Sequence, residues 1–382
     1  MVRNPINSLR PRRMPRQMPR QMLSQRASTA QNGVSADPPN GRTGGVLASV
    51  DVAIPSYQYA PFLRDCVMSV LSQHGPQLRV LIVDNASTDG SAEIAQELAA
   101  ADSRVTAWLN ERNRGLHDSC NRAVDWAGAD YFVLLDADDL LAAGALAAAT
   151  AYLDDHPDVA MAYGVEARLT GGLLDPGRCD APRPRWRTVE GYEFIRRTCW
   201  DSFCDIGAPA VIVRTSAQKS AGHFRESLVR TFDFEMYLRL ATFGTVARTN
   251  RVLGVRRVHE AQLSTPYIEQ PLRDFVEHEL AFASFFAHEG AALPGASKLE
   301  QMSRRKMGDY VYWWALWRFL RGRPDARPGF DFAVQRRRAP NWLPPVMFLF
   351  KVRWLRSAWR GVRRVLHKPT PLPSSYRMPK YR

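Results

Sequence analysis

From about residue 47 onward, short apolar runs alternate with segments that have helical periodicity. The apolar runs predict strands at Val50–Ile54, Arg79–Val83, Val105–Leu109 and Tyr131–Leu135. The segments between them predict helices at Pro61–Gln73, Gly90–Ala101 and His117–Trp126. This alternation is typical of βαβ units, so we expect an α/β fold with a mostly parallel sheet flanked by helices. In such sheets ligands bind beyond the carboxyl ends of the strands.

The segments that follow these four strands are rich in polar side chains. They are Pro55-Ser56-Tyr57, Asp84 to Gly90, Asn113-Arg114-Gly115 and Asp136-Ala137-Asp138-Asp139. Three carboxylates within four residues at the end of a buried strand repel one another and lose solvation, and a divalent cation such as Mg²⁺ or Mn²⁺ relieves both costs. The alternative is that one Asp caps a helix beginning near Leu140 while the others are solvated. Because four strand ends converge, we favour the metal site.

Taken in order, these segments resemble the family 2 glycosyltransferases, which have the GT-A fold. The resemblance starts from Ile54-Pro55-Ser56-Tyr57, Val83 to Ser91, Asn113-Arg114-Gly115 and Leu135 to Asp139. The segments Asp233 to Leu240 and Val255 to His259, the latter followed by Ser264, look like the family's later motifs. The resemblance covers roughly residues 47–265 and implies a GT-A catalytic domain there, in a non-processive, inverting enzyme.

The resemblance also implies roles for individual residues. Its nucleotide-sugar-binding residues would be Pro55, Ser56, Tyr57, Asp84, Asn113, Gly115, Asp136 and Ala137. Among them, Asp84 would hydrogen-bond the nucleobase and Asp136 would approach the ribose. Asp138 would hold Mn²⁺ or Mg²⁺ on the diphosphate of the donor, for which we favour a UDP-sugar. His259 would be a further metal ligand or a diphosphate contact, and the alternative is a surface histidine beside two arginines.

Asp233 aligns with the catalytic base of the family. It would take the proton from the acceptor hydroxyl, and a single base without a covalent intermediate gives inversion. The alternative is that Asp233 only favours the N-terminus of a helix, and Glu235 is the reserve candidate for the base.

The chain departs from the family pattern at three places. Gln58 replaces a usual Asn, and Phe232 replaces an acid next to the base. An Arg that would face the diphosphate is missing, and Arg114 or Arg122 is expected to compensate.

The net charge of +14 is unevenly distributed, with +7 in residues 1–45, −10 in 46–300 and +17 in 301–382. An acidic body with basic ends does not describe a nucleic-acid reader. We expect a disordered basic tail over residues 1–46 and a helical, basic, Trp-rich region over 266–382. Within that region, a helix over 346–368 would place apolar and Arg side chains on opposite faces, which suits an anionic membrane surface. The alternative is a helix packed on the catalytic domain.

The five cysteines show no paired C-x-x-C spacing, and the chain has no run of eighteen apolar residues. We therefore expect reduced thiols and a cytoplasmic protein, peripheral at the inner face of the plasma membrane if the basic helix binds lipid. The expected acceptor is a glycan or lipid-linked glycan of cell-surface polysaccharide assembly. A nucleotidylyltransferase is disfavoured because the first loop lacks glycine, and a processive synthase because it would have several spanning helices. The remaining alternative is a non-catalytic nucleotide-sugar-binding or membrane-surface scaffold protein.

Overall fold

The structure is a computed structural model, and it describes residues 47–171, 173–174, 185–203, 206–260, 262, 267 and 270–336. The basic tail predicted for residues 1–46, Ser264 and the helix predicted for 346–368 lie outside the described residues.

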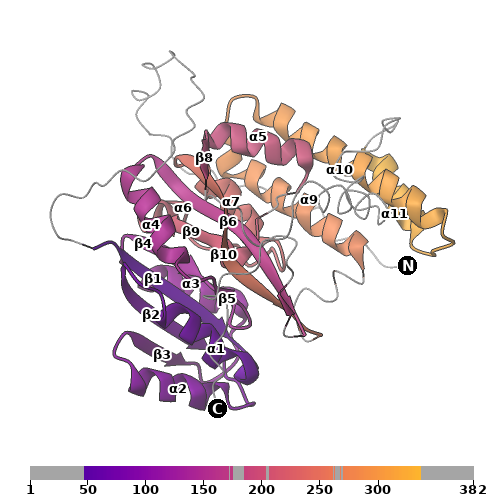
Figure 1. Cartoon of the computed structure of the whole chain (residues 1–382). Helices are drawn as coiled ribbons and strands as arrows, with labels where there is room; N and C mark the ends of the chain where they lie inside the picture. Colours follow the sequence, from indigo (N-terminus) through magenta and orange to yellow (C-terminus); the bar gives the residue numbers. More distant parts are fainter. Residues whose placement is uncertain are drawn as a thin grey trace, which may run out of the picture. The chain divides into compact units, whose positions relative to one another are not determined.

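A ten-stranded mixed sheet forms the centre of the fold. Its strands are β1 (Ser49–Ser56), β2 (Gln77–Asp84), β3 (Val105–Leu109), β4 (Tyr131–Leu134), β5 (Leu140–Leu141), β6 (Val159–Thr170), β7 (Leu173–Leu174), β8 (Trp186–Val189), β9 (Val211–Arg214) and β10 (Thr245–Val258). The order is β3-β2-β1-β4-β9-β6-β10-β5 (Figure 1). In addition, β7 pairs with β6 and β8 pairs with β10. The first four strands pair in parallel, as do β6 and β10, whereas β9 is antiparallel to both β4 and β6. The four predicted strands and the mostly parallel sheet are thus confirmed.

The helices of the described residues surround this sheet. They are α1 (Ala60–Leu71), α2 (Ser91–Ala101), α3 (Leu116–Trp126), α4 (Ala145–Asp155), α5 (Gly191–Asp201), α6 (Thr215–Ala221), α7 (Phe232–Leu240), α9 (Pro271–Ala287), α10 (Ala296–Phe319) and α11 (Ala326–Arg336), with short 3₁₀ turns η1 (Ala208–Ala210) and η2 (Glu289–Ala292). The three helices predicted between the first strands are present, and their ends lie within two residues of the predicted ones.

Side chains alternate between two apolar cores along the central strands. Val80 and Ile82 of β2 face a core shared with α1, α2 and α4, whereas Leu81 and Val83 face a second core shared with α3, α5 and α7. Successive residues of a strand point to opposite faces, so a strand covered on both sides is apolar throughout. This double burial explains why the strands appear in the sequence as continuous apolar runs.

The segment after Asp139 forms a strand instead of the helix considered near Leu140. Leu140 and Leu141 pair antiparallel with Val255 and Gly254 of β10, and the next helix begins only at Ala145. A Cβ atom at Gly254 would lie 2.3 Å from the carbonyl carbon of Pro209, so β10 can approach η1 closely only with glycine there. The alternative in which an Asp of this segment caps a helix is therefore wrong.

The helices α9, α10 and α11 pack on the rest of the fold rather than standing apart. Phe282 and Phe285 of α9 and Leu299 of α10 belong to the same core as α5 and α7. A smaller core, formed by Phe275, Met307, Tyr310, Val311, Trp314, Ala315 and Phe332, joins α9, α10 and α11 (orange to yellow in Figure 1). Among the described residues, no helix has both the length and the apolarity that a bilayer span requires.

Candidate functional site

A cavity of about 740 Å³ lies where the loops after β1, β2, β3 and β4 meet. Nine of the residues singled out from the sequence line it, namely Pro55, Ser56, Tyr57, Asn113, Gly115, Asp136, Ala137, Asp138 and Asp233. Asp84 and His259 do not line it. The volume lies within the range of small-molecule sites, which hold roughly 300–1,000 Å³. The convergence expected at the strand ends is therefore present.

The loops after β1 and β2 are joined by the side chain of Gln58. Its amide oxygen accepts a hydrogen bond from the main-chain nitrogen of Thr88 (3.1 Å), and its amide nitrogen donates to the Thr88 hydroxyl (3.0 Å). The Gln58 main-chain nitrogen donates to the hydroxyl of Ser87 (3.0 Å). The longer amide thus connects two walls of the cavity, which gives this departure from the family pattern a structural role.

Asn85, to which the motifs assign no role, connects the loops after β2 and β3. Its side-chain oxygen accepts hydrogen bonds from the Asn110 amide (3.0 Å) and from the Arg114 main chain (2.8 Å). Its nitrogen donates to the side-chain oxygen of Asn113 (2.8 Å), which also accepts from the nitrogen of Gly115 (2.9 Å). The feature of the sequence that could have marked Asn85 as part of the site is its position directly after a buried strand.

Several buried polar atoms at the cavity wall have no partner among the described residues. The hydroxyls of Ser56 and Ser119 are buried, line the cavity and are unpaired. One carboxylate oxygen of Asp84 accepts from the Ser87 main chain (2.9 Å), and the other is buried and unpaired just behind the wall. Buried polar groups in proteins are nearly always hydrogen-bonded, so unpaired ones at a cavity wall are candidates to bind a ligand there.

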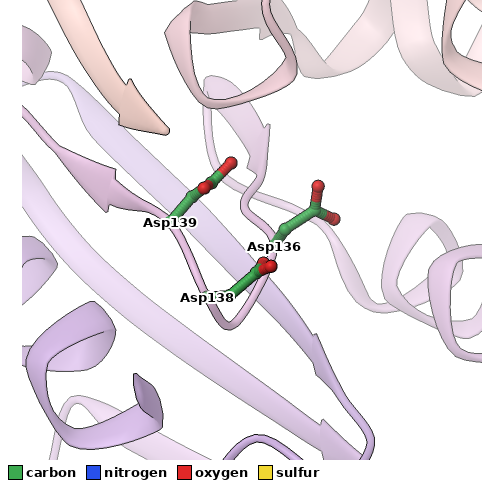
Figure 2. A group of neighbouring side chains, drawn as sticks. All are labelled: Asp136, Asp138 and Asp139. Atoms are coloured by element: carbon green, nitrogen blue, oxygen red, sulfur yellow. The ribbon is translucent and has the colours of Figure 1, made fainter. Parts of the chain in front are cut away.

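The three carboxylates of the acidic cluster, Asp136, Asp138 and Asp139, stand on the short turn between β4 and β5 (Figure 2). One ligand atom of each lies within 4.8 Å of the others, and Asp138 and Asp139 are buried. Asp139 accepts a hydrogen bond from the main-chain nitrogen of Arg257 (3.0 Å), so β10 fixes its orientation.

His259 follows β10 directly and contacts the acidic cluster at Asp138. Its Nε2 lies 3.0 Å from Oδ2 of Asp138, and its ring stacks on Phe62 with the centroids 4.5 Å apart. Only 17% of the side chain is exposed, so the alternative of a surface histidine is wrong. Its role as a metal ligand remains a prediction.

The carboxylates of the cluster are hard to ionise together. Burial, with the charges of Asp138 and Asp233 added, raises the pKa of Asp136 to about 7, although Arg256 opposes the shift. Burial and the same kind of repulsion also raise the pKa of Asp139. A divalent cation would replace the protons that hold such a cluster together. The all-oxygen donor set fits Mg²⁺ or Mn²⁺, and Asp136 and Asp138 are the side chains that would hold it.

Asp233 lies at the start of α7, on the wall of the same cavity. Its Oδ1 accepts a hydrogen bond from the main-chain nitrogen of Phe234 (2.7 Å). Burial raises the pKa of Asp233, while this hydrogen bond and the positive charge of Arg230 oppose the shift. A carboxylate with a raised pKa is a stronger base, as a proton acceptor requires.

Three expectations about charged residues need correction. Glu235 is fully buried between Arg225 and Arg239, outside the cavity, so it cannot serve as the reserve base. Arg114 pairs with Asp118 (2.9 Å) and Arg122 donates to Asn110 (2.5 Å), and neither reaches the cavity.

The positively charged residues that do line the cavity are Arg168, Arg230 and Arg256. Two residues of α9, Asp274 and His278, and one of α10, Tyr310, also line it. The sequence carried no signal for these helix residues because they belong to no motif.

The raised pKa of Asp136 makes a prediction about stability. Between about pH 4, where Asp ionises in unfolded chains, and pH 7, the folded protein binds a proton that the unfolded chain has lost. Stability should therefore fall as the pH rises through this window. In EDTA, Asp136→Asn should be more stable than wild type at pH 8 by at least about 1 kcal/mol and equally stable at pH 4. Urea denaturation at both pH values measures this, and equal stability at pH 8 would contradict the raised pKa.

Comparisons with known proteins agree with this geometry. Residues 51–220 match the family model for Glycosyl transferase family 2. An uncharacterized protein, y4gI, of Sinorhizobium fredii is 30% identical over 196 residues, which cover 50% of this chain and 20% of that protein. The chondroitin synthase of Escherichia coli is 26% identical over 212 residues, which cover 55% of this chain and 29% of the synthase. This chain thus matches less than a third of the length of either relative.

Among solved structures, the mannosyltransferase PcManGT of Pyrobaculum calidifontis, in complex with GDP-Man and Mn²⁺, has a similar fold. The TM-score is 0.54 at 19% identity, and the match covers 88% of this chain and 85% of PcManGT. The match to PcManGT therefore extends over most of the chain outside residues 51–220. This agrees with the packing of the C-terminal helices on the rest of the fold. Residues 51–220 are thus similar to glycosyltransferase family 2, and the fold of the chain is GT-A.

Proposed function

We propose that this protein transfers one sugar from a nucleotide-diphospho-sugar to a hydroxyl of a glycan or lipid-linked acceptor in cell-surface polysaccharide biosynthesis. The observation that carries the proposal is that the acidic cluster and Asp233 line one cavity together with the loops after β1 and β3. Such a site can hold a charged donor at one place and accept a proton at another. Support for this class of reaction comes from the family match and from the relative named as a chondroitin synthase.

The donor half of the site is formed by the loops after the first four strands. The unpaired hydroxyls of Ser56 and Ser119 would hydrogen-bond the nucleoside or the diphosphate. Asp136 and Asp138 would hold Mn²⁺ or Mg²⁺, and His259 would orient Asp138 or join the ligand set. When bound, the metal would neutralise the charge that develops on the departing diphosphate. A UDP-sugar remains our favoured donor, and GDP-sugars belong in any panel because PcManGT was solved with GDP-Man.

On the acceptor half, Asp233 would remove the proton of the attacking hydroxyl. The acceptor oxygen forms a bond to the anomeric carbon while the bond from that carbon to the diphosphate oxygen breaks. Attack from the face opposite the leaving group inverts the anomeric configuration, and no second carboxylate nucleophile is needed. The raised pKa of Asp233 suits this role because it makes the carboxylate a stronger base than an exposed aspartate.

Asp233→Asn separates proton transfer from donor binding. The variant keeps the size of the side chain and removes the base, so donor affinity should stay within about threefold while turnover falls by roughly 10²–10⁴-fold. Release of nucleoside diphosphate from a panel of UDP-, GDP- and dTDP-sugars with Mn²⁺ measures turnover, and water serves as the slow acceptor.

Asp125→Asn is the matched control because its carboxylate is 65% exposed and lies outside the cavity. Turnover of Asp233→Asn at the wild-type rate would refute the assignment of the base. Donor binding without turnover in the wild type, with every acceptor tried, would favour the scaffold alternative.

We also propose that the protein contacts an anionic membrane surface through the turn between α10 and α11. Phe319 and Leu320 are 64% and 75% exposed at this turn. Arg321 and Arg323 are exposed beside them, and the guanidinium of Arg321 lies 3.8 Å from the ring centroid of Trp317. Apolar tips next to arginines suit insertion between anionic headgroups.

Removing both apolar side chains tests the membrane contact. The variant Phe319→Ser/Leu320→Ser should bind vesicles of phosphatidylglycerol and phosphatidylcholine at least tenfold more weakly than wild type, since each buried side chain contributes about 1.5–3 kcal/mol. Co-sedimentation of the full chain measures the partition. Phe243→Ser, at an exposed residue between α7 and β10, is the matched control. Unchanged binding of the double variant, or equal binding to pure phosphatidylcholine, would contradict the proposal.

A further inference from the structure

The cavity extends beyond Asp233 into an area formed largely by the C-terminal helices. We call this area the distal end, and its lining residues are Phe203, Arg230, Phe234, Asp274, His278 and Tyr310. Five of the six follow residue 220, where the match to the family model stops. The family match therefore says nothing about what those five side chains do.

His278 presents an unpaired nitrogen at the distal end. Its Nδ1 lies 2.9 Å from the main-chain oxygen of Asp274. Because a carbonyl oxygen can only accept, Nδ1 carries the hydrogen. Burial lowers the pKa of His278, against the opposing charge of Asp274, so the ring is neutral at pH 7. Its Nε2 then carries a lone pair, for which the described part of the chain provides no hydrogen-bond donor.

Arg230 supplies a hydrogen-bond donor at the same end. Its Nη1 forms an ion pair with Asp274, which balances most of its charge. Its Nε is buried and, among the described residues, has no hydrogen-bond partner. The distal end thus offers one donor from Arg230 and one acceptor from His278, with the carboxylate of Asp233 close enough to affect both.

Aromatic rings form the rest of the distal wall. The ring of Phe203 lies 5.0 Å from that of His278 and 4.8 Å from that of Tyr310, and Phe234 lies 5.2 Å from His278. Sugar rings pack their C–H faces on aromatic side chains and direct their hydroxyls to polar groups at the edge. A wall of aromatic rings with a few fixed polar atoms therefore suits a carbohydrate.

The charges of the distal end restrict which carbohydrate can bind. The carboxylates of Asp233 and Asp274 face the guanidinium of Arg230, which Asp274 already pairs. The balance is negative, so a ring that carries its own carboxylate or phosphate meets like charge.

We propose that the distal end is the acceptor subsite and that it takes an uncharged sugar ring, with His278 Nε2 accepting a hydrogen bond from a hydroxyl next to the reacting one. The inference rests on the proposed glycosyl transfer because it places the acceptor beside Asp233. It deepens that proposal by giving the class of acceptor and a binding residue outside the matched family segment.

Binding of simple glycosides to the full chain saturated with UDP and Mn²⁺ tests the subsite. The probes are methyl glucoside, galactoside and mannoside, with methyl glucuronide and galacturonide as the charged counterparts of the first two. Saturation-transfer NMR gives each affinity. Two comparisons decide the charge preference: methyl glucoside with methyl glucuronide, and methyl galactoside with methyl galacturonide. In at least one of them, we expect the neutral glycoside to bind at least tenfold more tightly than the uronide.

Variants of His278 test the hydrogen bond. His278→Leu should weaken the neutral glycoside at least tenfold, whereas His278→Gln, whose amide oxygen can replace Nε2, should stay within about threefold of wild type. UDP affinity should be unchanged in both. The matched control is His288→Leu. His288 follows the end of α9, the helix that contains His278, and its Nδ1 likewise lies close to a main-chain oxygen four residues earlier (2.8 Å from that of Ser284), but it lies outside the cavity.

The outcomes separate this inference from the proposed function. Failure of the wild type to bind any of UDP, GDP and dTDP in the presence of Mn²⁺ overturns both. If UDP binds, the subsite alone is overturned by uronides that bind as tightly as neutral glycosides, by the absence of glycoside binding or by an unaffected His278→Leu. If His278→Leu also loses UDP binding, the result for His278→Gln decides. Glycoside binding by His278→Gln supports the subsite, and a lack of glycoside binding by this variant contradicts the subsite.

Discussion

The site depends on the antiparallel pairing of β5 with β10. This two-residue strand holds the turn after β4 against a strand that lies more than a hundred residues later in the sequence. The pairing lets the Arg257 main chain bind Asp139 and brings His259 to Asp138. Without it, the acidic cluster would be a loop of solvated carboxylates, although the pairing of β4 with β9 would still join the two halves of the sheet.

The pairing also explains why the cluster is unfavourable on its own. It buries carboxylates side by side, and their burial and mutual repulsion raise the pKa values of Asp136 and Asp139. Strongly shifted pKa values are concentrated at functional sites, where binding of a charged ligand can offset the unfavourable electrostatics. The unpaired hydroxyls of Ser56 and Ser119 fit the same interpretation, since a ligand in the cavity would satisfy them.

Much of the donor half of the cavity was predictable from local sequence. Strands covered on both faces must be apolar throughout, so their ends, and the polar loops after them, could be placed within a residue or two. The β5 strand could not be predicted, because two leucines carry no periodicity and their pairing partner is remote. Helical periodicity shows that Asp233 and Glu235 cannot both face the cavity, since residues two apart on a helix point to different sides. The structure was needed to show that Asp233 is the one that does. His278 and Tyr310 lie beyond such reasoning because only tertiary packing of α9 and α10 brings them to the cavity.

The central claim is that the acidic cluster holds the donor through a divalent cation. Titration calorimetry of UDP, with Mn²⁺ or with EDTA, tests it most directly in the wild type and in Asp138→Ala. We expect Mn²⁺ to tighten UDP binding at least tenfold in the wild type and to have little effect in the variant. Equal UDP affinity with and without Mn²⁺, or an Asp138→Ala variant that responds to Mn²⁺ as the wild type does, would contradict it.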